Sequence, residues 1–241
     1  MNRVVSFSRP GVAETFFTWL DYFALTKPKL VSMVLLSTMA GFYLGTAASF
    51  NFFLSGITLA ATAFVAAGSM VLNQVLEREI DAKMVRTQNR PLPAGRLEMR
   101  EALSFGLTLS LIGFSCFALF VNWVSAFLAF VTWASYLFVY TPLKLKTSLS
   151  TLVGAIPGAL PPAIGWAAAQ GSVHFQAFLF FLIIFFWQMP HFLAIAWMYR
   201  EDYKRAGIQV LSVIDREGAF VARQMILNVC ALMLVSLLPS L

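Results

Sequence analysis

The feature that most constrains this chain is the uneven distribution of its charged residues. Three long stretches contain no Asp, Glu, Lys or Arg: 30–76, 102–143 and 147–199. Each stretch is long enough for two helices of about 20 residues that cross a bilayer. Each also has a polar or flexible break near its middle, at 46–51, 122–123 and 170–174. The sequence therefore predicts three transmembrane helical hairpins, followed by a seventh span that begins near Gln224.

The basic residues predict how these spans are oriented. All 17 Lys and Arg residues fall in four clusters, within 3–29, 78–100, 144–146 and 200–223. An even number of predicted spans separates neighbouring clusters, so all four lie on the same side of the membrane. The positive-inside rule places that side in the cytoplasm, or in the matrix if the protein is mitochondrial.

Composition supports a membrane protein and argues against a nucleic-acid partner. Hydrophobic residues make up 59% of the chain and charged residues 12%, whereas a soluble domain carries roughly 25% charged residues. The net charge of +6 then reflects cytoplasmic loops beside a lipid bilayer.

A regular row of oxygen-bearing side chains follows the second predicted span. Asn73, Glu77 and Asp81 are spaced four residues apart, and on a helix such residues lie along one face. Carboxylate and amide oxygens suit Mg²⁺, which takes one or two carboxylates together with substrate phosphates. Four bases follow closely and are candidates to bind phosphate oxygens, with arginine offering bidentate geometry: Lys83, Arg86, Arg90 and Arg96. The alternative interpretation is a solvated cytoplasmic loop whose carboxylates are incidental.

A second cluster of mixed charge lies at the cytoplasmic end of the sixth predicted span. Glu201 and Asp202 stand between Arg200 and the pair Lys204 and Arg205. Two clusters of acids and bases on one side of the membrane favour a single shared site over two unrelated loops.

The motifs along the chain resemble a known family. The pattern N-x-x-x-[DE]-x-x-x-D followed by M-x-R-T-x-x-R-P-x-x-x-G is similar to the first signature of the UbiA-type intramembrane prenyltransferases. Within that superfamily, the blocks are most similar to the protoheme IX farnesyltransferase (heme O synthase) family. The further blocks, in family order, are TKPK (26–29), YTPLKLK (140–146), GAIPGALPPAIGW (154–166), WQMPHFLAIAW (187–197) and DYKRAG (202–207).

The resemblance implies an all-α polytopic transmembrane bundle. Residues 1–241 form a single prenyltransferase domain on this interpretation. Seven spans are visible, whereas the family has nine helices around a central cavity. We therefore expect that the C-terminal helices are missing from this sequence.

The resemblance also implies an activity, namely transfer of the farnesyl group of farnesyl diphosphate to a vinyl group of heme B, which makes heme O for terminal oxidases. Mg²⁺ is the implied cofactor, and heme B is a substrate. The implied metal ligands are Asn73, Glu77, Asp81 and Asp202, with Glu201 as a further candidate. The implied diphosphate-binding residues are Lys27, Arg86, Arg90, Lys144 and Lys146.

Two more residues receive functional interpretations. Tyr140 is a candidate to stabilise the allylic cation through its ring, or else an interfacial aromatic anchor. His191 is a candidate heme-binding residue, because ionisable residues inside membranes are frequently functional. Its alternative is a neutral histidine in a helix kinked by Pro190.

Other functions remain open at this stage. A UbiA-type enzyme that prenylates an aromatic quinone precursor is the closest alternative, and a non-catalytic heme or lipid carrier is another. A coupled transporter is disfavoured. Transporters place polar groups near the bilayer midplane, whereas the charged residues of this chain gather on one side of the predicted spans. The resemblance implies the bacterial cytoplasmic membrane more than the mitochondrial inner membrane, with heme A synthase or oxidase assembly proteins as possible partners.

Overall fold

The computed structural model of the 241-residue chain describes residues 12–46 and 49–240. This part of the chain is helical and contains no β-strand. Seven helical segments are long and apolar enough to cross a membrane, which confirms the predicted all-α polytopic bundle. They run as α2 (Pro28–Gly45), α3 (Phe52–Leu76), α5 with the π-helix η1 (Met99–Val121), α6 with the π-helix η2 and α7 (Trp123–Leu143), α8 with α9 (Ser150–Gln170), α10 (Phe175–Met198) and α13 (Ala219–Leu237).

The predicted breaks coincide with helix ends, and local chemistry explains them. Asn51 caps α3 by accepting a hydrogen bond from the backbone N–H of Leu54, and Asn122 caps α6 by accepting from Ser125 N. Such side-chain oxygens satisfy N–H groups that have no partner within the helix. Gly171 ends α9 in the left-handed region, at φ 75°, where glycine has no steric penalty.

The fifth span is bent because of its prolines. It consists of α8 (Ser150–Ala159) and α9 (Pro161–Gln170), with Pro157 inside α8. A proline removes one backbone donor and clashes with the preceding turn, so the span divides where Pro161 starts a new helix.

Neighbouring helices approach closely at glycines. α2 packs along α9, and a Cβ added to Gly41 would overlap the backbone of Pro162. α3 packs along α5, and a Cβ on Gly113 would collide with Val65. Small residues at helix contacts are the usual means of close packing inside a membrane.

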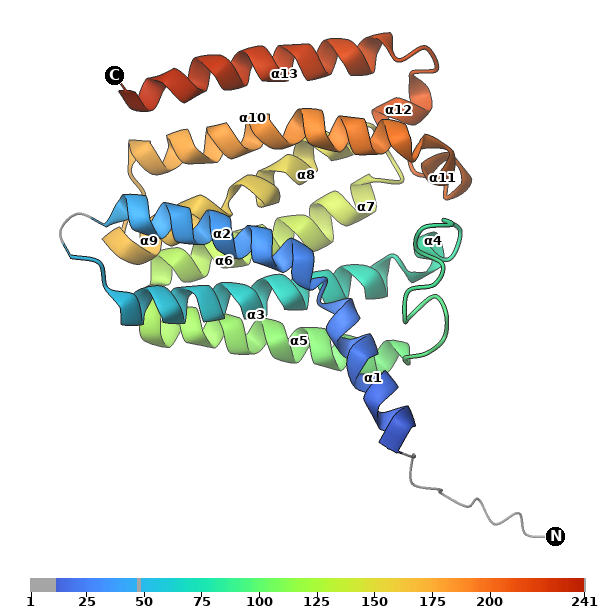
Figure 1. Cartoon of the computed structure of the whole chain (residues 1–241), viewed down its shortest axis with the longest axis horizontal. Helices are drawn as coiled ribbons and strands as arrows, with labels where there is room; N and C mark the ends of the chain where they lie inside the picture. Colours follow the sequence, from blue (N-terminus) through green and yellow to red (C-terminus); the bar gives the residue numbers. More distant parts are fainter. Residues whose placement is uncertain (1–11, 47–48, 241) are drawn as a thin grey trace.

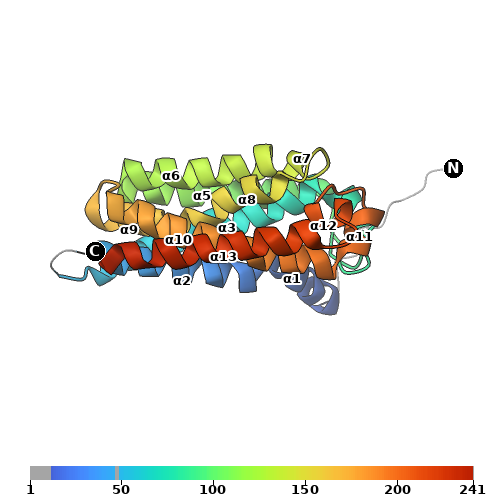
Figure 2. The same cartoon turned by 90° about the horizontal axis from the view of Figure 1, so that it is seen from above.

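The helices lie side by side, with α13 packed along α10 at one edge (Figures 1 and 2). The short helices α1 (Val12–Leu25), α4 (Arg78–Asp81), α11 (Arg200–Arg205) and α12 (Leu211–Ile214) gather at one end of the bundle (Figure 1). The charged segments within 12–29, 78–100, 144–146 and 200–223 therefore meet at that end, whereas the part of the first cluster at 3–11 lies outside the described residues.

Candidate active site

The predicted row of oxygen ligands lies at the end of α3. The helix ends at Leu76, but its pattern of backbone bonds continues: Glu77 N donates to Asn73 O at 2.9 Å, and Asp81 N donates to Glu77 O at 2.8 Å. The three side chains therefore keep a common face, as the spacing predicts. All three are buried, Asn73 and Asp81 to within 1% exposure and Glu77 to 6%.

Each carboxylate of the row forms an ion pair with a base from elsewhere in the chain. Lys144 Nζ lies 2.6 Å from Glu77 Oε1, and Arg90 donates to Asp81 Oδ2 at 2.6 Å. Burial alone lowers the pKa of the Lys144 ammonium, but Tyr140 and the carboxylate of Glu77 outweigh it, so that this pKa is raised overall. Lys144 therefore carries its charge throughout the physiological range.

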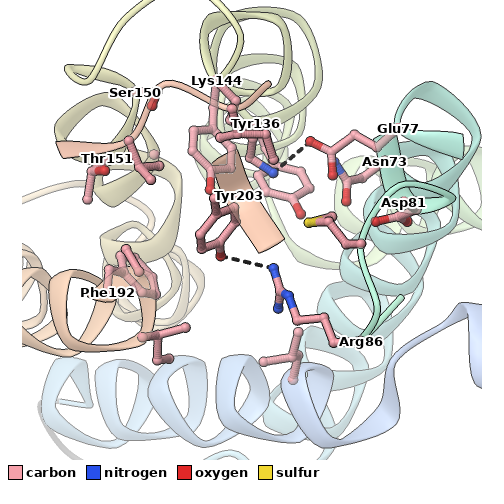
Figure 3. Close-up of a pocket in the computed structure, with 18 of the residues that line it drawn as sticks. Asn73, Glu77, Asp81, Arg86, Tyr136, Lys144, Ser150, Thr151, Phe192 and Tyr203 are labelled. Atoms are coloured by element: carbon pink, nitrogen blue, oxygen red, sulfur yellow. Dashed lines mark hydrogen bonds and ion pairs between the residues drawn. The ribbon is translucent and has the colours of Figure 1, made fainter. Parts of the chain in front are cut away.

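These residues surround a cavity of about 310 Å³ at the charged end of the bundle (Figure 3). One part of its wall is charged and polar, and another is apolar, formed by residues such as Phe192, Ile195 and Val210. Eight of the predicted site residues line it: Lys27, Asn73, Glu77, Asp81, Arg86, Arg90, Tyr140 and Lys144.

Lys27 enters this cavity from a strained turn between α1 and α2. Its φ of 50° makes it the one non-glycine residue with positive φ in residues 12–46 and 49–240. Such a conformation costs of order 1–3 kcal/mol and is found mainly at functional positions. Burial, and next the nearby charge of Arg90, lower the pKa of the Lys27 amine to about 7.

Arg86 is held between two aromatic rings. Its guanidinium lies 5.1 Å from the ring centre of Tyr199 and 5.0 Å from that of Tyr203. It also donates to the Tyr203 hydroxyl at 2.9 Å (Figure 3). Stacking and hydrogen bonding both suit the planar guanidinium, so the α11 segment orients a base that comes from the other charged loop.

Tyr140 lies beside Lys144, as its position in the sequence suggested. The Lys144 ammonium sits 4.5 Å from the centre of the Tyr140 ring, and Tyr136 stacks on that ring at 5.6 Å. The ring also covers Gly154, where an added Cβ would overlap it. The face of Tyr140 thus already attracts a cation in this structure.

Four predicted residues do not line the cavity. Asp202 is 9% exposed, and its carboxylate accepts from Val85 N at 3.3 Å and from Arg86 N at 3.4 Å, so it joins α11 to the loop that carries Arg86. The remaining three are Glu201, which is exposed and 3.7 Å from Arg200, Lys146, which is exposed, and His191, which is exposed and stacked on Trp187 at 5.8 Å.

Comparison with known proteins shows the family. The model of the UbiA prenyltransferase family matches residues 34–241. The chain belongs to this family. It is 49% identical over 230 residues to a protoheme IX farnesyltransferase of Solibacter usitatus, covering 92% of this chain and 79% of that protein. It is 43% identical over 223 residues to a protoheme IX farnesyltransferase of Aquifex aeolicus, covering 92% and 76%.

Solved structures show the UbiA fold at lower sequence identity. The structure of a digeranylgeranylglyceryl phosphate synthase has a TM-score of 0.75 at 18% identity, covering 92% of this chain and 77% of that one. A UbiA homologue from Archaeoglobus fulgidus bound to DMAPP and Mg²⁺ has a TM-score of 0.71 at 18% identity, covering 89% and 76%. The arrangement of helices is therefore that of the UbiA prenyltransferases.

The residues present fit a metal of the Mg²⁺ type. In the part of the chain that the structure describes, no three His, Cys, Asp or Glu side chains come together as a closed metal cage. The cavity instead offers two carboxylates and one amide, from Glu77, Asp81 and Asn73. Mg²⁺ is usually bound by one or two carboxylates with water and substrate phosphates completing the shell, so this open set suits a UbiA prenyltransferase.

Sequence reasoning missed three residues that shape the site. Tyr136 and Tyr203 line the cavity, and Thr141 accepts a hydrogen bond from Asn73 at 3.2 Å. Tyr203 and Thr141 lie within the blocks DYKRAG and YTPLKLK, so those blocks carried a signal. Their side-chain directions depend on how distant helices pack.

Proposed function

We propose that this chain transfers the farnesyl group of farnesyl diphosphate to a vinyl group of heme B, giving heme O. The observation that carries the proposal is the cavity in which a row of buried acids faces a set of bases. The names of relatives up to 49% identical support the choice of substrates.

The bases of the cavity bind the diphosphate. Lys144 and Arg90 are each paired with a carboxylate in the free enzyme, and they exchange that partner for phosphate oxygens when substrate arrives. Arg86, held between its two tyrosines, presents further donors, and Lys27 adds a fourth positive charge. Fixed donors of this kind stabilise the charge that develops on a leaving group.

The carboxylates released by this exchange hold the cofactor. Asn73, Glu77 and Asp81 are the residues we assign to Mg²⁺, which supplies charge neutralisation at the diphosphate when bound. The predicted roles of Asp202 and Glu201 as metal ligands, and of Lys146 as a diphosphate ligand, stay predictions, because these residues lie outside the cavity lining.

In the proposed reaction, bonds change at C1 of the farnesyl chain and at the heme vinyl group. The C1–O bond of the farnesyl diphosphate breaks, and its electron pair leaves with the diphosphate. The π-electrons of the heme vinyl group form the new bond to C1, and the carbocation left on the heme side chain takes up water and loses a proton. Tyr140, whose ring face already holds the Lys144 ammonium at 4.5 Å, stabilises the allylic cation in the same way.

The apolar wall of the cavity suits the apolar parts of both substrates. It is formed by residues from α10 and the segment that follows α11, among them Phe192, Ile195 and Ile208. His191 is the neighbour of Phe192, but it is exposed and stacks on Trp187. Its proposed contact with heme therefore belongs to the outer surface of α10.

The proposed location of the protein in the membrane rests on the same arrangement. The site lies at the end of the bundle that gathers the charged loops (Figure 1), and the positive-inside rule assigns such loops to the cytoplasm. We therefore propose the bacterial cytoplasmic membrane with the cavity mouth on the cytoplasmic side. Heme A synthase or oxidase assembly proteins are the proposed partners.

The test is an assay of the purified protein with heme B, farnesyl diphosphate and Mg²⁺, followed by mass spectrometry. The expected product is heme that has gained a farnesyl group and a hydroxyl group. A parallel reaction replaces heme with an aromatic acid. Prenylation of the acid without any farnesylated heme contradicts the acceptor assignment, and binding of both substrates without turnover supports a carrier instead.

A further inference from the structure

A π-helical turn brings a threonine hydroxyl against the metal-facing row. The π-helix η2 (Ser135–Tyr140) is followed by Thr141, whose backbone N–H donates to Tyr136 O. The Thr141 hydroxyl donates to the same carbonyl at 2.8 Å. Single π-helical turns are rare and are frequently found at functional sites. Thr141 is buried, with 5% exposure.

These bonds determine which way the Asn73 amide faces. A threonine hydroxyl has one proton to donate, and Thr141 gives it to Tyr136 O. Its oxygen can therefore only accept from Asn73, and the Asn73 Nδ2 lies 3.2 Å away as donor. These hydrogen bonds turn the amide nitrogen of Asn73 toward Thr141. The amide atom that then faces the cavity lined by Asn73 is Oδ1. In the part of the chain that the structure describes, the side-chain hydrogen bond of Asn73 runs through Nδ2 to Thr141.

The segment that follows η2 also contacts the next residue of the row. Lys144, three residues after Thr141, pairs with Glu77, four residues after Asn73. The two segments thus meet in register at successive turns, one through a hydroxyl and one through an ammonium. The Lys144 contact is replaced when substrate binds, whereas the Thr141 contact involves only the amide nitrogen and is compatible with a metal on the oxygen.

We propose that Thr141 is a positioning residue that keeps the amide oxygen of Asn73 directed at the bound metal. The proposal rests on the proposed function only in assigning Asn73 to Mg²⁺. Without the acceptor at Thr141, the amide of Asn73 can rotate and present its NH₂ group to the cavity. An NH₂ group has no lone pair for a cation, so the metal loses a ligand for part of the time.

The experiment measures Mn²⁺ binding to the full chain in detergent with inorganic pyrophosphate, by electron paramagnetic resonance of the free ion. Thr141→Val is expected to weaken Mn²⁺ binding about tenfold, the scale of one hydrogen bond that orients a ligand. Thr141→Ser, which keeps the hydroxyl, restores binding to within about threefold. In an Asn73→Ala background, Thr141→Val has no further effect, since no amide remains to orient.

The control tests whether loss of a hydroxyl in this helix matters by itself. Thr132 lies in α6, before the π-turn, and its hydroxyl donates to Leu128 O; Thr132→Val is expected to leave Mn²⁺ binding unchanged. Thr141→Ala removes the same acceptor with a smaller side chain if the valine variant does not fold. Mn²⁺ affinity that is unaltered in both Thr141 variants, or that falls equally with and without Asn73, overturns the proposal. Because heme and farnesyl diphosphate are absent, failure of the proposed reaction leaves this test intact.

Discussion

Replacing Lys144 by glutamine is expected to change Mg²⁺ affinity in opposite directions with and without diphosphate. In the free enzyme the Lys144 ammonium lies 2.6 Å from the Glu77 carboxylate, so a metal must displace it. The removal of Lys144 therefore strengthens metal binding when no diphosphate is present. When diphosphate is present, Lys144 binds phosphate, and its removal weakens the ternary complex.

The size of the effect follows from the geometry of this pair. Two unit charges about 4 Å apart interact by about 4 kcal/mol at an effective dielectric constant of about 20. Both side chains are largely buried, at 17% and 8% exposure, so solvent screens the pair only in part. Desolvation of the charges offsets some of this attraction. A net gain of about 1.4–2.8 kcal/mol remains, which corresponds to tenfold to hundredfold tighter Mg²⁺ in Lys144→Gln without diphosphate.

The assay is a Mn²⁺ titration followed by electron paramagnetic resonance, with and without inorganic pyrophosphate. Lys144→Arg keeps the positive charge and is expected to retain the wild-type dependence on pyrophosphate. Arg78→Gln removes the same charge from an exposed position beside Glu77 and is expected to change neither titration.

One result refutes the reasoning. If Lys144→Gln weakens Mn²⁺ binding equally in both titrations, Lys144 supports the structure of the site and does not compete with the metal.

Three further predictions follow from the site. The pKa of the Lys27 amine is about 7 and rises when a diphosphate binds beside it, so the affinity for pyrophosphate is full below pH 7 and falls up to about tenfold per pH unit above it. Isothermal titration with pyrophosphate at several pH values should show this slope, and Lys27→Arg should abolish it. Gly154→Ala places a Cβ against the Tyr140 ring and should lower stability by about 1–3 kcal/mol, whereas Gly56→Ala, which meets no atom within 4 Å, should raise the thermal unfolding temperature slightly. Asp202→Asn should weaken pyrophosphate binding about tenfold by loosening its backbone contacts, with Mn²⁺ binding unchanged; loss of Mn²⁺ binding would instead support a direct metal ligand.

Local patterns were sufficient to predict the row and much of its surroundings. The four-residue spacing of Asn73, Glu77 and Asp81 remains in the structure because backbone bonds continue beyond the end of α3. Arg86 was found from the charged loop and Lys27 from the family resemblance, and both line the cavity. Spacing along one helix is a local property, so it survives whatever the rest of the chain does.

Contacts between distant segments could not be predicted from the sequence. The pairing of Lys144 with Glu77, and of Thr141 with Asn73, joins residues more than 60 positions apart. Thr141 and Lys144 both follow the π-helix η2, whose presence the sequence did not indicate. The sequence also gave no sign that the carboxylate of Asp202, a metal ligand by family resemblance, accepts hydrogen bonds from the backbone of Val85 and Arg86.

The sequence by itself determined where the seven spans of these residues lie and that the charged loops gather at one end of the bundle. These properties follow from the cost of placing charges in hydrocarbon, which acts on each segment separately. The tertiary structure alone decided which base meets which acid, and which predicted residues reach the cavity. Those choices depend on the rotation and contact of neighbouring helices at glycines and prolines, where a change of one residue in register turns a side chain from the cavity to the lipid.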